Sequence, residues 1–524
     1  KSGITLDPIF SVFNAWRDTL DATIQSKAKF RPGIDSAIGF WHALRKTPVY
    51  HELRAGGLGF SNTIRGRIRS EASAHRLVMP TSAGGKVVST ILHPFEALAD
   101  LARPFEEAAR VGEALRMRGQ GKPVASAVRG GMEISTNFQQ SGMATPMKAF
   151  AQMTAFFNPA VQSLDRAFRV AGGDAYAIAR LTGKSRAEAL GQALKPGSRV
   201  ALMGVATVSM PSAILWFVNR DDQEIQDLRK TNAGLIYWFV RDPTGQIRHI
   251  PKPFLWGQIF GTGVEAALDR LLEKDPEAVA RLGQGILDQA SVGVLPTVVA
   301  QADAQRRNKT SFFETPIVPP ELLDTVEPRY QASERTGRAA RAVSAGIGKV
   351  GQIVGNETLE RSVSPARLES LVRGFGGRLG GYGIQLADKV LDRGETGAAP
   401  SMQAVDVPLI GRFSARTPST GVKPVQDFYE LLRRAREATK TLTLLENSED
   451  FAGADAYEVR HADVLDRYAD LDGTAKAMRE VRQEQELYRT DPTMSAQEKR
   501  RRIDELTREL VALAREAVNP GPPL

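Results

Sequence analysis

The sequence contains no cysteine among its 524 residues. This absence excludes a disulfide framework, a thiol nucleophile and every metal site with cysteine ligands. Histidine is scarce as well, because the chain has only six and no two of them share a helix face at a spacing of three or four residues. We therefore expect no metal, no cofactor and no catalytic residue, and we predict that the chain is not an enzyme.

The rest of the composition is that of an ordinary folded protein, with 42% hydrophobic and 25% charged residues. The charge is uneven, since residues 421–524 carry a net charge of −4 and the first 420 residues carry +13. In one interpretation this basic body contacts phosphate groups or an anionic membrane surface. In the other, the arginines only keep a large helical protein soluble. The chain begins at Lys1 without an initiator methionine, so we expect a processed product or a fragment of a longer polypeptide.

Periodic segments rich in Ala and Leu predict a mainly α-helical protein, an elongated or bundled arrangement of many helices. One short β-hairpin is expected near residues 236–250, because two β-prone runs flank Asp242-Pro243-Thr244-Gly245, which suits a type I turn. We predict five regions: 1–120 (N-terminal helices), 121–314 (a helical core), 315–335 (a proline-rich surface connector), 336–424 (glycine-rich helices) and 425–524 (amphipathic C-terminal helices).

Near the C-terminus, Ser495 and Glu498 form a capping-box pattern that predicts the start of an amphipathic helix. Its apolar stripe consists of Ile503, Leu506, Leu510, Leu513 and Ala517. Such a stripe needs a partner. We favour a preceding helix of the same chain, around residues 465–487, over a neighbouring subunit.

Residues 200–219 form a long segment without any charged residue, between Arg199 and Arg220. Twenty helical residues span about 30 Å, which is the thickness of a bilayer core, and the Trp-Phe pair near one end is typical of a membrane interface. Several polar residues and a proline dilute its hydrophobicity, so we favour a helix that is buried on all sides in the folded protein and meets lipid later. The residues predicted to contact a membrane are Leu202, Met203, Ile214, Leu215, Trp216 and Phe217.

Two short patterns imitate catalytic motifs. Gly183-Lys184-Ser185 resembles the end of a phosphate-binding loop, but Ile178 stands where the first glycine is required, and a turn between two helices is favoured. Glu133-Ile134-Ser135 resembles the acid of lytic transglycosylases, in which a buried glutamate protonates a glycosidic oxygen. The sugar-groove motifs that should follow are missing, so a peptidoglycan-degrading lyase using Glu133 is kept as an alternative only.

A motif follows the predicted hairpin, with the sequence Ile250-Pro251-Lys252-Pro253-Phe254-Leu255-Trp256-Gly257-Gln258-Ile259-Phe260-Gly261. It resembles the signature of a large polyvalent protein-associated domain found in giant proteins of phages and mobile elements. The resemblance extends roughly from Trp41 to Glu430. Its other pieces are Asn158-Pro159-Ala160-Val161-Gln162, the apolar residues 200–219, Pro316-Ile317-Val318-Pro319, Ser364-Pro365-Ala366-Arg367-Leu368-Glu369, the glycine-rich residues 374–381, and Asp406-Val407-Pro408 with Phe413. The motif residues expected to have a structural role are Pro251, Lys252, Pro253, Phe254, Gly257, Phe260 and Gly261.

The resemblance implies a structural virion protein of the kind that short-tailed phages carry inside the particle. Such internal, or ejection, proteins are packaged near the portal and leave ahead of the DNA to help build a conduit through the host envelope. The expected partners are other copies of the chain in a ring-like homo-oligomer, the portal or other internal virion proteins, packaged DNA and the host inner membrane. A DNA-packaging protein held by charge alone is a further alternative, and it predicts non-specific binding that falls steeply with salt.

Overall fold

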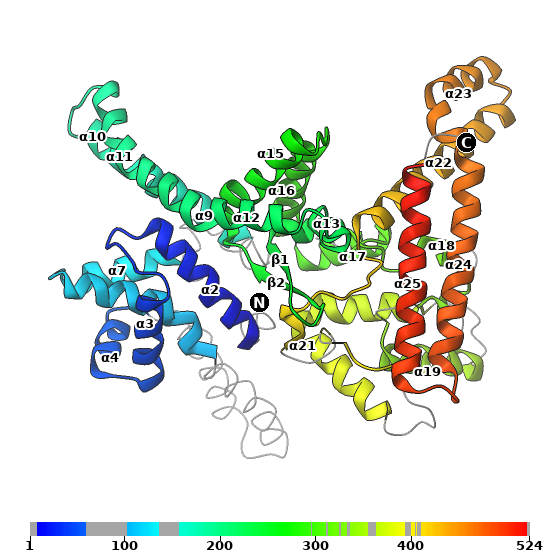
Figure 1. The fold of residues 1–524 in the computed structure, drawn as a ribbon, viewed down its shortest axis with the longest axis horizontal. Helices are drawn as coiled ribbons and strands as arrows, with labels where there is room; N and C mark the ends of the chain where they lie inside the picture. Colours follow the sequence, from blue (N-terminus) through cyan, green and yellow to red (C-terminus); the bar gives the residue numbers. More distant parts are fainter. Residues whose placement is uncertain are drawn as a thin grey trace.

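The computed structural model describes residues 8–58, 102–135, 157–294, 296–310, 313–323, 326–332, 336–354, 363–392, 400–403, 405 and 410–520. Helices dominate these parts of the chain, and their β-structure is one antiparallel hairpin with two isolated bridges, so the predicted fold class is confirmed (Figure 1). The hairpin consists of β1 (Tyr237–Arg241) and β2 (Ile247–Pro251), with Phe239 opposite His249. At its turn the Gly245 N–H donates to the Asp242 carbonyl at 2.9 Å, which closes the predicted turn.

The helices fall into three groups along the chain. The N-terminal group is α2 (Pro8–Gln25), α3 (Ile34–Arg45), α4 (Pro48–Ala55), a helix over residues 102–119 and α7 (Val124–Ile134). The central group is α9 (Phe157–Phe168), α10 (Asp174–Leu181), α11 (Arg186–Gly204), α12 (Met210–Val218), α13 (Gln223–Arg229), α14 (Phe254–Trp256), α15 (Gly263–Leu272), α16 (Ala278–Val294) and α17 (Thr297–Arg307). The third group is α18 (Pro320–Leu323), α19 (Arg338–Val354), α21 (Pro365–Asp392), α22 (Lys423–Asn447), α23 (Phe451–Leu465), α24 (Tyr468–Thr490) and α25 (Ala496–Val518).

Two π-helical turns and one kink interrupt the central helices. The π turns are η2 (Val205–Ser209) between α11 and α12 and η4 (Gly257–Thr262) between α14 and α15. The kink is η1 (Arg169–Gly173) between α9 and α10, where Gly172 has a φ of 122°. A π turn accommodates one extra residue, so η2 and η4 rotate the faces of the helices that follow them. The turns η2 and η4 pack against each other beside the hairpin.

The C-terminal helices form a bundle in which α22, α24 and α25 share one apolar core (Figure 1). Ile503, Leu506 and Leu510 of α25 are buried in the chain, and the Gln485 side chain of α24 donates to the Ile503 carbonyl at 3.2 Å. The stripe predicted for this helix therefore has an intramolecular partner, as expected. The same core continues to the hairpin through Phe239 and Ile247, so the bundle is anchored to the central helices.

The proline-rich connector differs from the surface segment that the sequence predicts. Ile317 and Val318 are buried in an apolar cluster with residues of α17 and α21. The side chain of Asn308 bonds the Val318 backbone from both sides, accepting from its N–H at 3.0 Å and donating to its carbonyl at 2.6 Å. Because this amide replaces the hydrogen bonds that water would supply, an irregular backbone is tolerated inside the protein. The predicted piece Asp406-Val407-Pro408 lies outside the described residues.

Candidate functional site

The uncharged segment lies within one continuous helical element, Arg186–Val218, made of α11, η2 and α12. Among the described residues it is the one helix long and apolar enough to cross a membrane, with a mean hydropathy of 1.8 over its best 18 residues. Only 33% of that window is buried, so the expectation of a helix buried on all sides is wrong. Leu202, Ile214 and Phe217 are 63%, 57% and 55% exposed.

The reason for this exposure is the distribution of residues around the helix. Its inward face carries Gly204, Ser209 and Ser212, the small and polar residues that make the segment less hydrophobic in the sequence. Leu202, Met210 and Ile214 point outward instead, whereas Val200 and Val208 are buried on the inward face. The π turn η2 keeps that outward stripe continuous, because α-helical geometry alone would rotate residues 210–218 away from the exposed face of α11.

Polar side chains hold the inward face to the rest of the domain. The Ser209 hydroxyl donates to the Phe260 carbonyl at 2.7 Å, and the Trp238 indole N–H donates to the Ser212 hydroxyl at 2.7 Å. The Trp216 indole N–H donates to Asp269 Oδ1 at 2.7 Å. Trp216 is therefore a buried anchor of α12, away from the exposed stripe, and an aromatic ring at the end of an apolar run is here part of the core.

The six residues predicted for membrane contact thus divide into three sets, of which Trp216 alone is fully buried. Leu202, Ile214 and Phe217 lie on the exposed face. Met203 and Leu215 are half-buried and pack on an apolar cluster of the domain.

The Ile-Pro-Lys-Pro-Phe run leaves β2 and leads into α14, and its backbone carbonyls bind the N-terminal helix α2. The Trp16 indole N–H donates to the Pro251 carbonyl at 2.9 Å, and Arg17 Nε donates to the Lys252 carbonyl at 3.0 Å. The Arg17 guanidinium also lies over the Phe254 ring, 4.4 Å from its centroid. The motif therefore joins α2 to the hairpin.

The side chain of Lys252 is fully buried. Its Nζ lies 2.7 Å from the Gly234 carbonyl, 2.8 Å from the Glu265 carboxylate and 3.2 Å from the Thr262 hydroxyl. Three acceptors match the three N–H donors of an ammonium group. Burial lowers the pKa of Lys252, and the charge of Glu265 opposes that shift.

A second buried ion pair lies one helical turn further along α15. Both terminal nitrogens of Arg229 donate to Asp269, at 2.9 and 2.7 Å, and this is the carboxylate that also accepts from Trp216. Sequence analysis missed both Glu265 and Asp269. Acidic residues four apart on an amphipathic helix are the usual pattern of a solvated face, so no local signal marked them as core.

Glycine lets these elements approach one another closely. A Cβ on Gly204 would lie 2.4 Å from the Phe260 ring, and a Cβ on Gly257 would lie 2.7 Å from Cβ of Lys252. A Cβ on Gly261 would contact Ser212 and Val208 at 3.1 and 3.2 Å. The motif residues therefore form the packing junction between the hairpin, α2 and the exposed apolar helix, in keeping with a structural role.

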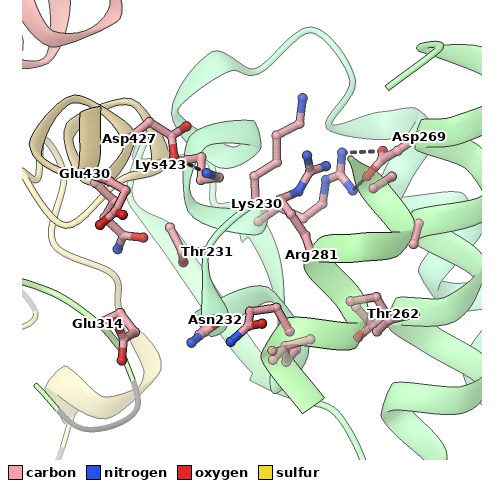
Figure 2. A pocket seen from close by; sticks show the side chains of 18 of the residues that line it. Lys230, Thr231, Asn232, Thr262, Asp269, Arg281, Glu314, Lys423, Asp427 and Glu430 are labelled. Atoms are coloured by element: carbon pink, nitrogen blue, oxygen red, sulfur yellow. Dashed lines mark hydrogen bonds and ion pairs between the residues drawn. The ribbon is translucent and has the colours of Figure 1, made fainter. Parts of the chain in front are cut away.

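A polar cleft of about 470 Å³ lies between the central helices and α22 (Figure 2). Its charged residues pair with one another: Lys423 with Asp427, Lys309 with Glu430 at 3.6 Å, and Arg281 with Asp275, which lies just outside the lining, at 2.6 Å. Because each cation has an acidic neighbour, the cleft offers no uncompensated charge to a ligand.

The two patterns that resemble catalytic motifs, at residues 133–135 and 183–185, have structural explanations. Glu133 forms ion pairs with Arg129 and with Arg169, at 3.5 and 3.2 Å, so its carboxylate joins α7 to the turn that follows α9. Residues 182–185 join α10 to α11, and Ser185 and Glu188 form a reciprocal capping box there. The prediction of a turn between two helices is confirmed. No group of metal-ligating side chains is found in the described parts of the chain.

Comparison with known families gives a match to part of the chain. Residues 226–410 match the family model described as Large polyvalent protein associated domain 38. This is the family that the Ile-Pro-Lys-Pro-Phe run resembles, and the match covers a shorter stretch than the resemblance from Trp41 to Glu430. No curated protein and no solved structure matches the chain.

Proposed function

Because residues 226–410 form a large polyvalent protein-associated domain of the kind found with phages and mobile elements, we propose that this chain is an internal virion protein that leaves the particle ahead of the DNA and helps form a conduit across the host envelope. In this proposal several copies assemble near the portal, together with the portal or other internal proteins. The chain then acts by assembly and membrane contact, with no chemical step of its own.

The observation that carries the proposal is the exposed apolar face of the helix Arg186–Val218. A soluble protein seldom leaves so long a row of large aliphatic residues in contact with water, and such patches usually mark a protein or membrane contact. The buried contacts of Ser209, Ser212 and Trp216 fix the opposite face of the helix, so the exposed face is held ready for a partner. The family match supports a role in phages or mobile elements, and the exposed apolar face supports contact with a membrane or another protein.

The test is to follow the chain through infection. Purified particles should contain it, and after adsorption to host cells it should be lost from the emptied particles and recovered in the envelope fraction. A major capsid protein, which stays outside, is the control for contamination by whole particles. If the chain were absent from purified particles, or if it stayed in the emptied ones, the proposal would be wrong.

A further inference from the structure

The helices α10 and α11 form an antiparallel hairpin that projects from the body at the upper left of Figure 1. A tight turn over residues 182–185 closes its tip, where Gly183 has a φ of 82° that favours glycine. The Arg180 side chain donates to the Lys184 carbonyl at 2.8 Å, and the Ser185–Glu188 capping box begins α11. The tip is thus a well-formed turn.

Small residues occupy the contact between the two arms of this hairpin. Ala179 and Ala189 are completely buried. A Cβ on Gly172 would lie 2.5 Å from the Ala193 carbonyl, and a Cβ on Gly197 would lie 2.9 Å from the Ala171 carbonyl, so the two backbones approach very closely.

The large apolar residues of the arms point outward instead. The exposed ones on α10 and α11 include Ile178, Leu181, Leu190 and Leu194, and Leu181 at the tip is 87% exposed. Small residues inside and large aliphatic residues outside are the arrangement of helix pairs that pack within lipid, and the reverse of a hairpin that folds for water.

The charge of the hairpin is mostly of one sign. Arg180, Lys184 and Arg186 surround the tip, and Lys195 and Arg199 lie further along α11. None of these five takes part in an ion pair within the described parts of the chain. The nearest acidic side chain on α11, Glu188, is engaged by Ser185.

We propose that the tip of this hairpin binds an anionic lipid surface, with Leu181 entering the interface and Arg180, Lys184 and Arg186 contacting headgroup phosphates. The inference rests on the proposed function for its setting and names the first point of lipid contact. Transfer of an exposed leucine from water into the membrane interface is favourable, and each nearby basic residue adds electrostatic attraction to an anionic leaflet. A second copy of the chain would need acidic residues opposite these cations, and the hairpin itself supplies few. The tip is continuous with the exposed face of Arg186–Val218, so contact there places the longer stripe next to the bilayer.

The absence of cysteine makes the test direct, since a single introduced thiol is the only site of labelling. The full chain with Leu181→Cys is labelled with a polarity-sensitive fluorophore and mixed with vesicles of phosphatidylcholine alone or with phosphatidylglycerol. We expect a blue shift with the anionic vesicles only. The matched control is Leu487→Cys on α24, which is also strongly exposed and should report no change.

A second experiment reverses the charge of basic residues at the tip. Lys184→Glu with Arg186→Glu should weaken binding to the anionic vesicles by roughly 30-fold at low salt. The matched pair Arg501→Glu with Arg508→Glu, on the exposed side of α25, should leave binding within about twofold of the unsubstituted chain.

Three results would overturn the inference: no shift at position 181 with anionic vesicles, a shift that needs no vesicles and grows with protein concentration, or a shift given by DNA in place of vesicles. The second would assign the tip to another copy of the chain, and the third to nucleic acid. The infection experiment described under the proposed function does not depend on this vesicle assay. The proposed function can therefore be correct when this inference is wrong, and this inference can be correct when the proposed function is wrong.

Discussion

The ammonium of Lys252 lies 2.8 Å from the carboxylate of Glu265, and both side chains are buried. The lysine of the Ile-Pro-Lys-Pro-Phe run is thus half of an internal ion pair. It stands where β2 ends, and its own carbonyl accepts from Arg17 of α2, so one residue ties three elements together. The Gly234 carbonyl, Glu265 and Thr262 together satisfy the buried ammonium of Lys252.

Replacing Lys252 with methionine should destabilise the protein by about 3–5 kcal/mol, because the buried Glu265 would lose its cationic partner. The free energy of unfolding in urea measures the effect. The double variant Lys252→Met with Glu265→Leu should recover most of the loss. Lys476→Met, which removes an exposed cation, serves as the control. Equal stability of Lys252→Met and the control would contradict a buried ion pair.

Trp216→Phe should cost about 1–2 kcal/mol, since it removes the hydrogen bond to Asp269 while Arg229 keeps that carboxylate paired. The loosened α12 should also exchange its amide hydrogens faster than in the unsubstituted chain. Phe217→Leu, on the exposed side of the same helix, should change stability by less than about 0.5 kcal/mol. The prediction is wrong if the two variants are equally stable.

Leu202→Arg with Ile214→Arg should abolish flotation of the protein with liposomes while leaving its unfolding free energy almost unchanged, because both positions are exposed. Leu215→Arg gives the contrast. Leu215 is half-buried against the core, so arginine there should lower stability as well. Unimpaired flotation of the Leu202/Ile214 variant would remove this face from any role at the membrane.

Two acidic residues of α2 should give the N-terminal helices a pH-dependent stability. Burial raises the pKa of Asp18 to about 6 and that of Asp21 to about 7, against the opposing charges of Arg17 and Arg166. Oδ1 of Asp21 is buried without a hydrogen-bond partner in the described structure. Between pH 4 and 7 the folded protein therefore holds protons that the unfolded chain releases, and these two groups lower stability as the pH rises.

The variant Asp21→Asn removes part of that penalty. We expect it to exceed the unsubstituted chain in stability by about 1–3 kcal/mol at pH 8 and by much less at pH 5. Thermal unfolding at the two pH values measures the difference. The exposed residue Asp455 on α23 gives the control Asp455→Asn, whose difference from the unsubstituted chain should not depend on pH in this way. A constant difference for Asp21→Asn would contradict the raised pKa.

Local sequence signals correctly predicted the elements that form through contacts between residues near one another in the sequence. The turn at Asp242 and Gly245 predicts the hairpin, and Ser495 with the apolar stripe of α25 predicts a helix that packs within the chain. Both depend on residues only a few positions apart.

The exposure of the apolar helix could not be predicted in this way. Its orientation is set by pairs such as Trp216 with Asp269, which are far apart in the sequence. The sequence shows the length and hydropathy of the segment. It does not show which face of the helix packs against the rest of the protein. The serines, which reduce its hydropathy, proved to be its inward contacts.

The π turn at Val205–Ser209 places a constraint on how this protein can vary in evolution. Deleting one residue there would restore regular α-helix and rotate everything after it by about 100°. Trp216 would swing toward solvent, and outward side chains such as Ile214 would turn toward the hairpin. Related chains should therefore tolerate changes of residue type between Gly204 and Trp216 far more readily than a change in the number of residues. A single-codon deletion in this interval should be more damaging than most substitutions within it.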